Sequence, residues 1–383
     1  MKVVFCSNYM NHHQLPFCKA LLGIDGVEFT FVATEPVSEE RKKFGYEEMD
    51  SAFPWIIRAY ESKGEYARAE REILAADAVI FGHVPKGMPA ARLNKGKLSF
   101  FAAERFLRNG ISPLKALARY IIDPIRFNRK NCYLLCTGAY VAADYARFGG
   151  FKGKKYKWGY FPEVKRYADV DGLMKEKNPR SMLWAGRLLP LKHPEYALEV
   201  AKRLQAEGYD FTLRIVGGGE LEEPLKAQIA EMQLQERVCL LGAIPAGQVR
   251  AEMEKSEIFL FTSDKNEGWG AVLSEAMNSA CATVTSHTVG AAPFLVQDGE
   301  NGFLFQDGDV DELYSKVKRL FDEDGLSVKM GKNAYATMIN TWNPEHAARC
   351  FLALARQKLG EKSEPLTDVC SVAEPLTEGW YKG

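Results

Sequence analysis

Two carboxylates eight residues apart form the most informative pair in the chain. Glu267 and Glu275 stand on either side of the turn Gly268-Trp-Gly270. A short apolar run at 258–262 precedes the turn and a stretch of helical composition at 271–280 follows it, which predicts a buried strand, a tight turn and a helix. Glu267 then lies at the helix mouth, where N–H groups favour a phosphate. Glu275 lies about two turns further on, where it can accept hydrogen bonds from sugar hydroxyls. A surface acid followed by an acid on a helix face would give the same spacing, so other features must decide.

Two cations at the end of an earlier predicted strand could hold a diphosphate. Gly186 and Arg187 follow the apolar run at 181–185, and Lys192 stands in the next loop, just before Pro194. Arg offers a planar fork and Lys a mobile point charge, and each charge-assisted hydrogen bond contributes roughly 1.5–3 kcal/mol. Taken singly, both residues are more commonly surface cations.

A run of glycines ends the next predicted strand. Gly217 and Gly218 belong to Ile215-Val-Gly-Gly-Gly219, where the lack of side chains allows a ligand to approach the backbone closely. The run fits neither the Gly-x-Gly-x-x-Gly pattern of dinucleotide-binding folds nor a phosphate loop that continues with Gly-Lys-Ser/Thr. A plain tight turn explains it at least as well.

Strands and helices alternate along the chain in two rounds. The first round predicts a helix at 14–22 and strands at 2–6, 27–33, 78–82, 98–102 and 133–137. The pattern breaks at 158–179, which we take as an interdomain linker. It then restarts with strands at 181–185, 211–216, 238–241 and 258–262 and helices at 194–207, 222–232 and 249–255. This rhythm predicts an α/β fold of two doubly wound, Rossmann-like domains. Because ligands of such folds bind beyond the carboxyl ends of the strands, we expect the domains to face each other across a cleft.

The composition is that of a soluble protein with room for two cores. The chain has 383 residues, of which 46% are hydrophobic. Its first apolar run is too short for a signal peptide and no later run reaches ~18 apolar residues, so a cytoplasmic location is expected. Eight cysteines lie scattered without a Cys-x2-Cys pair or a neighbouring set of His ligands. We interpret them as reduced core thiols, not as a metal site or a disulfide framework.

The two halves of the chain carry opposite charge. Residues 1–160 hold 25 Lys and Arg against 16 Asp and Glu, a net charge of +9, so the remainder, with 25 against 34, carries −9. The segment 105–130 alternates cations with apolar residues. It suits peripheral binding to the anionic inner face of the plasma membrane, where each cation near the headgroups contributes ~1 kcal/mol. A solvated helix face whose apolar stripe packs inward is an equal alternative.

Several of these features arrive in the order and approximate spacing of one known family. The chain resembles the family-4 retaining glycosyltransferases of the GT-B fold in Gly186-Arg187, Lys192, the run beginning at Gly217, Glu267 with Glu275, and a late turn at 298–305. The resemblance is strong over residues 180–310. It implies a nucleotide-diphosphate-sugar donor with UDP or GDP as the nucleotide. Arg187 and Lys192 would bind the diphosphate, Glu267 the sugar hydroxyls and Glu275 the ribose.

The same resemblance implies a division of labour along the chain. Residues 1–162 would form an acceptor-binding domain and residues 163–343 a nucleotide-sugar-binding domain. Residues 344–383 would form a final helix, at 344–359, and a tail that returns to the N-terminal domain.

The N-terminal half matches the family less well. Its first loop, residues 7–16, is polar and carries His12 and His13 where such enzymes are often glycine-rich, and we expect this loop to meet the acceptor. Glu104 directly follows the predicted strand at 98–103, near where many members carry a histidine. It is the first candidate for a sugar or acceptor contact in catalysis, with His12, His13 and His83 behind it. Ordinary polar loop residues are the alternative.

The expected chemistry is stabilisation of a leaving group. Departure of the nucleotide diphosphate builds negative charge beside Arg187, Lys192 and the helix mouth formed by Gly270, Ala271 and Val272. No metal and no cofactor beyond the donor are needed for this step. The pair Asp169-Val-Asp171 has a spacing that metal-dependent transferases use, but it lies in the predicted linker, away from a strand end. Retention of the anomeric configuration by front-face attack is implied by the family.

We therefore expect a metal-independent hexosyltransferase that acts on a glycan or a lipid-linked acceptor in surface polysaccharide or glycolipid synthesis, with no nucleic-acid partner. Two other classes stay open. A sugar-nucleotide epimerase of related fold would use the same diphosphate contacts but would turn over the donor without an acceptor. A non-catalytic membrane-associated binding protein would keep the basic segment and need no donor site.

Overall fold

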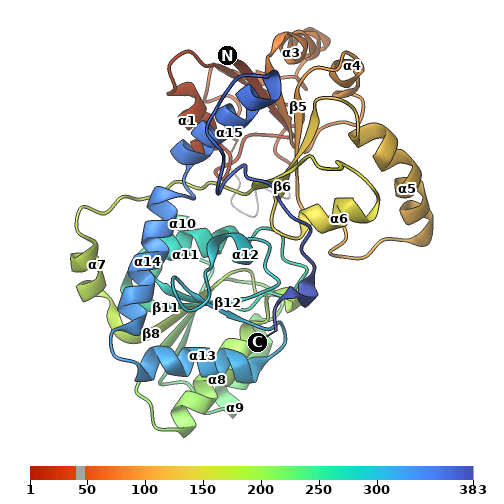
Figure 1. The fold of residues 1–383 in the computed structure, drawn as a ribbon. Coiled ribbons are helices and arrows are strands. Elements are labelled where there is room, and N and C mark those ends of the chain that lie inside the picture. The colour runs from red at the N-terminus through yellow and green to blue at the C-terminus, as the bar shows by residue number, and fades with distance from the viewer. Residues whose placement is uncertain (40–47, 383) are drawn as a thin grey trace. The chain divides into compact units, whose positions relative to one another are not determined.

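A computed structural model describes residues 1–39 and 48–382. The chain forms two compact units (Figure 1). Unit 1 consists of Met1–Glu163 and Asn343–Leu376, and unit 2 consists of Val164–Trp342 with the tail from Thr377 on. Each unit contains a parallel β-sheet with its own helices, as the alternation of strands and helices predicts.

Unit 1 is built on a sheet of seven strands in the described residues. They are β1 (Lys2–Ser7), β2 (Glu28–Ala33), β3 (Ile56–Arg58), β4 (Ala78–Phe81), β5 (Ser99–Ala103), β6 (Cys132–Thr137) and β7 (Lys155–Trp158). Their order in space is β3-β2-β1-β4-β5-β6-β7, and all pairings are parallel. The order reverses between β1 and β4, so the loops after these strands flank the switch point where ligands of such sheets bind. The sequence predicted five of these strands and missed β3 and β7, the two edges.

The helices of unit 1 are α1 (Leu15–Leu22), α3 (Lys63–Ala75), α4 (Ala90–Asn94), α5 (Pro113–Phe127), α6 (Val141–Arg147) and α15 (Pro344–Leu359). Although α15 comes late in the chain, it lies beside α1 (Figure 1). Its start is fixed by Asn343, whose side chain accepts from the N–H of His346 at 2.8 Å, and its end by Gly360, with φ 95°. The ring of Phe351 packs edge-on against that of Phe17 on α1, with 6.2 Å between centroids.

Unit 2 is built on a sheet of six strands in the described residues. They are β8 (Asn178–Ala185), β9 (Thr212–Val216), β10 (Val238–Gly242), β11 (Ser256–Phe261), β12 (Ala282–Ser286) and β13 (Phe303–Phe305). Their order is β10-β9-β8-β11-β12-β13, again all parallel. The switch point lies between β8 and β11, which are the strands that precede the predicted cations and the predicted carboxylate turn.

The helices of unit 2 pack apolar faces onto this sheet. They are α7 (Val170–Glu176), α8 (Pro194–Ala206), α9 (Glu222–Glu231), α10 (Ala246–Lys255), α11 (Ala271–Asn278), α12 (Ala292–Leu295), α13 (Val310–Asp322) and α14 (Leu326–Asn340), with 3-10 turns η1 (Pro190–Lys192) and η2 (Glu378–Trp380). On α13, for example, Leu313, Val317 and Leu320 recur at helical spacing and are buried in the core with Leu198 and Leu204 of α8. This packing holds the carboxyl ends of the strands in place.

Two boundaries differ from the predicted ones. The predicted linker at 158–179 contains α7, which begins where the side chain of Asp169 accepts from the N–H of Gly172 at 2.8 Å. The tail was predicted to return whole to the N-terminal domain, but from Thr377 on it belongs to unit 2. The physical reason is a hydrogen bond from the Tyr381 hydroxyl to the carbonyl of Leu304, at 2.8 Å, at the end of β13.

Candidate functional site

The switch point of the unit 2 sheet brings two predicted loops together. β8 and β11 are neighbours, so the loops that leave their carboxyl ends run side by side. The N–H of Asp264 donates to the carbonyl of Leu191 at 3.0 Å across these loops. The hydroxyl of Thr262 donates to the carbonyl of Lys192 at 2.7 Å and accepts from the indole N–H of Trp184 at 2.9 Å. Backbone and side chain thus fix where Lys192 stands.

Lys192 and Glu267 meet across these loops. The ammonium of Lys192 contacts Oε2 of Glu267, and each side chain is only 14% exposed. Nζ of Lys192 also lies 5.7 Å from the ring centroid of Phe261. Charges attract more strongly in such a half-buried place than in bulk water. The predicted diphosphate cation and the predicted sugar-binding carboxylate therefore share one place, although 75 residues separate them in sequence.

The helix mouth next to Glu267 depends on a glycine. Gly270 has φ 83°, and a Cβ there would lie 2.7 Å from the ring of Phe261 and 2.9 Å from Val289. Only glycine fits, and α11 begins at the next residue. Within the described part of the chain, the N–H groups of Ala271 and Val272 have no acceptor. They present two donors and the positive end of a short helix to a ligand.

Glu275 lies on α11, as predicted, with a partly buried side chain. Burial raises its pKa, and the positive charge of Arg250 acts in the opposite direction. No hydrogen-bond partner for this carboxylate occurs among the described residues. A partly desolvated carboxylate with open acceptor positions suits a ligand that carries hydroxyl donors.

The glycines after β8 and β9 serve contacts within the protein. Gly217 has φ 141°, and a Cβ there would lie 1.8 Å from the carbonyl oxygen of Gly186. A Cβ on Gly219 would lie 2.4 Å from the carbonyl of Leu188, whose N–H donates to Gly218 at 2.9 Å. The two loops pack backbone against backbone, so close approach by a ligand is not needed to explain Gly217 and Gly218. Arg187, which starts the first of these loops, is exposed.

His193 is a member of this site that the sequence prediction missed. It takes φ 47° between η1 and α8, its Nδ1 lies 2.8 Å from Oε1 of Glu195, and its Nε2 lies 3.6 Å from Oδ2 of Asp264. The hydrogen bond to Glu195 raises the pKa of His193 against the opposing effect of burial. The ring stacks on Tyr196 with 4.6 Å between centroids. Its place directly after Lys192 was the one available signal.

In unit 1 the predicted candidates gather around one tyrosine. Glu104, just after β5, contacts the hydroxyl of Tyr160 through Oε1, and its Oε2 lies 3.5 Å from Nη1 of Arg108. The ring of Tyr160 stacks on His13 with 5.4 Å between centroids and 13° between the ring planes. The structure therefore brings Glu104 and His13 together. Sequence reasoning missed Tyr160 because it follows β7, a strand that was not predicted.

His13 is held in its neutral form. Burial, with a smaller contribution from the charge of His12, lowers its pKa to about 3. Nδ1 of His13 and Oε1 of Gln14 are buried and have no hydrogen-bond partner within residues 1–39 and 48–382. A neutral imidazole binds hydroxyl groups but is a weak base near neutral pH. His12 and His83, the remaining candidates, are both exposed.

The basic segment forms α5 and leaves an apolar face open. Arg119 turns inward, where it pairs with the buried Asp123 at 2.6 Å and lies 3.5 Å from the ring centroid of Phe106. The large apolar side chains, between 52% and 82% exposed, are Leu114, Leu117, Tyr120, Ile121, Ile122 and Ile125. Because these side chains are exposed, the alternative in which the apolar stripe of this segment packs inward is wrong. Searched over the described residues, the helices include none that is both long and apolar enough to cross a bilayer.

The Asp169-Val-Asp171 pair is occupied by structural contacts. Asp169 caps α7, and Asp171 pairs with Lys332 of α14, which lowers the pKa of Asp171. Both carboxylates thus serve contacts within α7 and between α7 and α14.

Comparisons with known proteins match part of the chain to a known family. Residues 168–337 match the family model described as glycosyl transferases group 1. The amylovoran biosynthesis glycosyltransferase AmsK of Erwinia amylovora is 30% identical over 186 residues, 47% of this chain and 45% of that protein. An N-acetylgalactosaminyltransferase of Campylobacter jejuni, named for a diphospho-undecaprenol substrate, is 32% identical over 169 residues, 44% of each chain. The matches thus span less than half the length of these relatives.

The fold likeness extends further than the sequence likeness. The crystal structure of Anabaena HepE in complex with UDP has a TM-score of 0.66 to this chain, at 15% identity, and covers 92% of this chain and 98% of HepE. Residues 168–337 thus carry the likeness to the glycosyl transferases group 1 family, and the two parallel α/β sheets have the GT-B fold that the chain shares with HepE.

Proposed function

We propose that this chain is a retaining glycosyltransferase that moves a sugar from a nucleotide-diphosphate-sugar donor to a glycan or lipid-linked acceptor, in surface polysaccharide or glycolipid synthesis. The observation that carries the proposal is the meeting of Lys192 and Glu267 beside the open N–H groups of α11. A cation, a carboxylate and a helix mouth suit a diphosphate joined to a sugar better than they suit either alone.

The donor site uses each group for one part of the donor. Lys192, Arg187 and the N–H groups of Ala271 and Val272 bind the diphosphate and stabilise the charge that builds on it as the bond to the sugar breaks. Glu267 binds the sugar hydroxyls. The ribose hydroxyls donate to Glu275, whose partly buried carboxylate has open acceptor positions.

The contact between Lys192 and Glu267 also gives an order of events. Without donor, the two side chains neutralise each other. An arriving diphosphate competes with Glu267 for the ammonium of Lys192, and Glu267 becomes available to the sugar hydroxyls next to it. Each side chain keeps a hydrogen-bond partner at every stage, Lys192 the diphosphate and Glu267 the sugar hydroxyls, which matters because a charge without partners in a half-buried place is costly.

Unit 1 binds the acceptor through the loop that follows β1. Two polar atoms of this loop, Nδ1 of His13 and Oε1 of Gln14, are buried without a hydrogen-bond partner in the described residues. The hydroxyl groups of an acceptor can supply the missing hydrogen bonds. Glu104 accepts further hydroxyl donors next to Tyr160. A surface of hydroxyl-binding groups, one of them a carboxylate, fits a sugar better than it fits a phosphate.

The nucleotide is UDP or GDP. HepE was crystallised with UDP and with UDP-glucose, whereas a matched mycobacterial relative is named for GDP-mannose. Pocket shape decides between the bases, so the choice is left to measurement. No metal takes part in this proposal, because cations and helix N–H groups supply the positive charge.

The experiment is a thermal-shift titration of the full chain with UDP, GDP and their common sugar conjugates, since a ligand that binds the folded state raises its apparent stability. We expect one nucleotide to raise the melting temperature of the wild type and to lose most of that effect in Lys192→Met. Lys202→Met, an exposed lysine on α8, is the matched control. Equal shifts in both variants would refute the donor site, and turnover of the donor without acceptor would favour an epimerase.

The same protein works at an anionic membrane surface on the cytoplasmic side, bound through α5. Its exposed apolar face supplies contacts for acyl chains, and exposed cations along and just after the helix supply contacts for anionic headgroups: Lys115, Arg129 and Lys130. Such a location suits an enzyme with a lipid-linked acceptor.

Vesicle co-sedimentation tests this membrane site. We expect the full chain to bind phosphatidylglycerol-containing vesicles and not pure phosphatidylcholine, with binding lost in the double variant Leu117→Gln, Ile121→Gln. Leu359→Gln, which changes an exposed leucine at the end of α15, should bind like the wild type. Binding by the double variant at wild-type level would show that α5 is not the membrane contact.

A further inference from the structure

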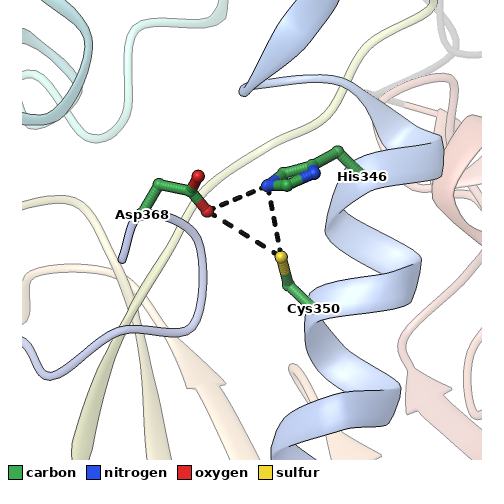
Figure 2. A group of neighbouring side chains, drawn as sticks. All are labelled: His346, Cys350 and Asp368. Atoms are coloured by element: carbon green, nitrogen blue, oxygen red, sulfur yellow. Dashed lines mark hydrogen bonds and ion pairs between the residues drawn. The ribbon is translucent and has the colours of Figure 1, made fainter. Parts of the chain in front are cut away.

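Three side chains converge in unit 1, away from the residues discussed so far. His346 and Cys350 lie one turn apart on α15, and Asp368 comes from the segment that follows this helix (Figure 2). Nε2 of His346 is 2.9 Å from Oδ1 of Asp368 and 3.3 Å from Sγ of Cys350, and Sγ is 3.8 Å from the same Oδ1. The three atoms therefore form a small triangle.

Local structure holds the triangle in place from both sides. The cap of α15 places His346 in its first turn, so Cys350 follows on the same face at i+4. On the other side, the segment after Asp368 runs along β7. The N–H of Cys370 donates to the carbonyl of Lys157 at 2.9 Å, and the N–H of Lys157 donates to Ser371 at 2.8 Å. Neither side depends on the triangle for its backbone hydrogen bonds.

Hydrogen bonding serves the three groups unevenly. If Nε2 of His346 carries a proton, it donates to Asp368 and cannot accept from the thiol of Cys350, which is left with a long contact of 3.8 Å to the same Oδ1. If it carries none, it accepts from the thiol, but its lone pair then faces the carboxylate oxygen at 2.9 Å. One imidazole nitrogen cannot serve both neighbours well.

The arrangement also differs from a catalytic triad, in which a histidine activates a cysteine nucleophile. In a Cys-His-Asp triad, the thiol and the carboxylate sit on the two different nitrogens of the imidazole, so that one side of the ring takes a proton while the other is held. Here both neighbours approach Nε2, as Figure 2 shows. Three lone pairs that converge in this way fit a cation at the centre of the triangle.

The dimensions and chemistry suit zinc. Bonds of about 2.0–2.3 Å at tetrahedral angles put ligand atoms about 3.3–3.6 Å apart. Of the three observed separations, 3.3 Å lies at the lower end of that range, 2.9 Å below it and 3.8 Å above it. Imidazole, thiolate and carboxylate together favour a borderline transition metal over Mg²⁺ or Ca²⁺.

We propose that Nε2 of His346, Sγ of Cys350 and Oδ1 of Asp368 bind one Zn²⁺ ion, which fastens the segment 368–373 onto α15. The thiol proton of Cys350 is released to solvent as the Zn–S bond forms. The side chains of His346 and Asp368 are 25% and 30% exposed, so water can reach the fourth position. The role is structural, because the site closes a loop of 18 residues between Cys350 and Asp368 within unit 1.

This site lies outside the proposed donor and acceptor residues, so it can be tested without an activity assay. The expectation that the cysteines have no neighbouring set of His ligands did not weigh the i, i+4 spacing of His346 and Cys350, which is that of helix-borne metal ligands.

Co²⁺ is the probe, because it takes zinc sites and its thiolate complexes absorb in the near-ultraviolet and visible. We expect the reduced, metal-stripped full chain to bind one Co²⁺ with a thiolate charge-transfer band and tetrahedral visible bands, both removed by added Zn²⁺. Cys350→Ser should lose the charge-transfer band and bind at least tenfold more weakly, and Asp368→Asn should bind more weakly while keeping the band. Cys239→Ser, at the exposed cysteine in unit 2, should behave as the wild type.

Three results would overturn the proposal: no Co²⁺ bound, a bound ion without a thiolate band, or an unchanged band in Cys350→Ser. If Cys350→Ser does not fold, Asp368→Asn gives the decision, since its altered group is 30% exposed and the change keeps the shape of the side chain. Zinc content of the purified chain by mass spectrometry, lost in Asp368→Asn and kept in Cys239→Ser, is the second measurement.

Discussion

The loops that follow β1 and β8 occupy the same position in their sheets and are built on opposite electrostatics. Each leaves the strand beside the switch point and each carries a histidine just before the next helix. In unit 1 that histidine, His13, is half-buried, its Nδ1 is buried without a hydrogen-bond partner in the described residues, and its pKa is lowered. In unit 2 it is His193, which lies between Glu195 and Asp264 and has a raised pKa.

The difference teaches how one sheet design serves two kinds of ligand. In a loop with paired charges, such as Lys192 with Glu267, a charged ligand can replace one member of the pair as the partner of the other. The other charge is then never buried without a partner. A loop of neutral polar groups suits hydroxyls, which pair with either tautomer of an imidazole. In the proposed function, unit 2 therefore binds a diphosphate and unit 1 binds a sugar.

The largest effect should come from removing the cation of the unit 2 loop. Lys192→Met keeps much of the side chain's length and deletes its charge. We expect transfer to fall by roughly 10²–10³-fold, about 2.7–4 kcal/mol, which is typical of losing one group that stabilises developing charge. Initial rates at saturating acceptor measure it, with Lys202→Met as the control. A loss below threefold would mean that the diphosphate is held elsewhere, with Arg187→Ala the next variant to test.

The second effect is the pH dependence of unit 1. The folded pKa of His13, about 3, lies below an unfolded value of ~6.5, so the unfolded chain binds the extra proton as the pH falls between them. Stability is complete above pH ~6.5 and declines below it, by about 2 kcal/mol at pH 5. His13→Gln should remove this decline. Hydrogen exchange of α1 at pH 5 and pH 7 measures this decline in stability. An equal decline in the variant would show that other groups cause it.

How far the sequence predicts each loop depends on how local its determinants are. The turn at Glu267 was predicted because an apolar strand, a glycine turn and a helix follow one another within a few residues. The contact between Lys192 and Glu267 was not, because it requires β8 and β11 to be neighbours, and strand order is set by packing of the whole sheet. The same limit hid Tyr160 and its stacking on His13.

Glycines show the limit from another side. Gly217 was interpreted as room for a ligand, yet the atom that a Cβ would meet is a carbonyl oxygen of the neighbouring loop. The residue type reveals that another group comes close, but only the fold reveals which group it is.

The exposure of a side chain likewise depends on residues far away in the sequence. The apolar residues of α5 have the spacing of a core-facing helix, and only the absence of a covering element among the described residues shows that their face is open.

A third, smaller effect should come from the carboxylate of unit 1. Glu104→Gln keeps the shape and weakens acceptance of hydroxyl donors, so we expect KM for the acceptor to rise about tenfold, roughly 1.4 kcal/mol, with KM for the donor unchanged. Steady-state kinetics with each substrate varied in turn separates the two constants. A rise in the donor KM alone would reverse the roles assigned to the two loops.

The smallest effect should come from the histidine of the unit 2 loop. Since the folded pKa of His193 is raised above its unfolded value of ~6.5, its charged contacts with Glu195 and Asp264 stabilise the folded state fully below that pH. They are lost as the pH rises through the folded pKa. His193→Asn retains a residue that tolerates φ 47° and removes the charge, so α8 should lose this dependence. The effect is smaller than that of His13 because a quarter of the side chain is exposed to water, which screens its ion pairs.

Hydrogen exchange of α8 between pH 6 and 8.5 measures this pH dependence. A wild-type α8 that becomes more protected as the pH rises would contradict the comparison, since both loops would then respond to pH with the same sign.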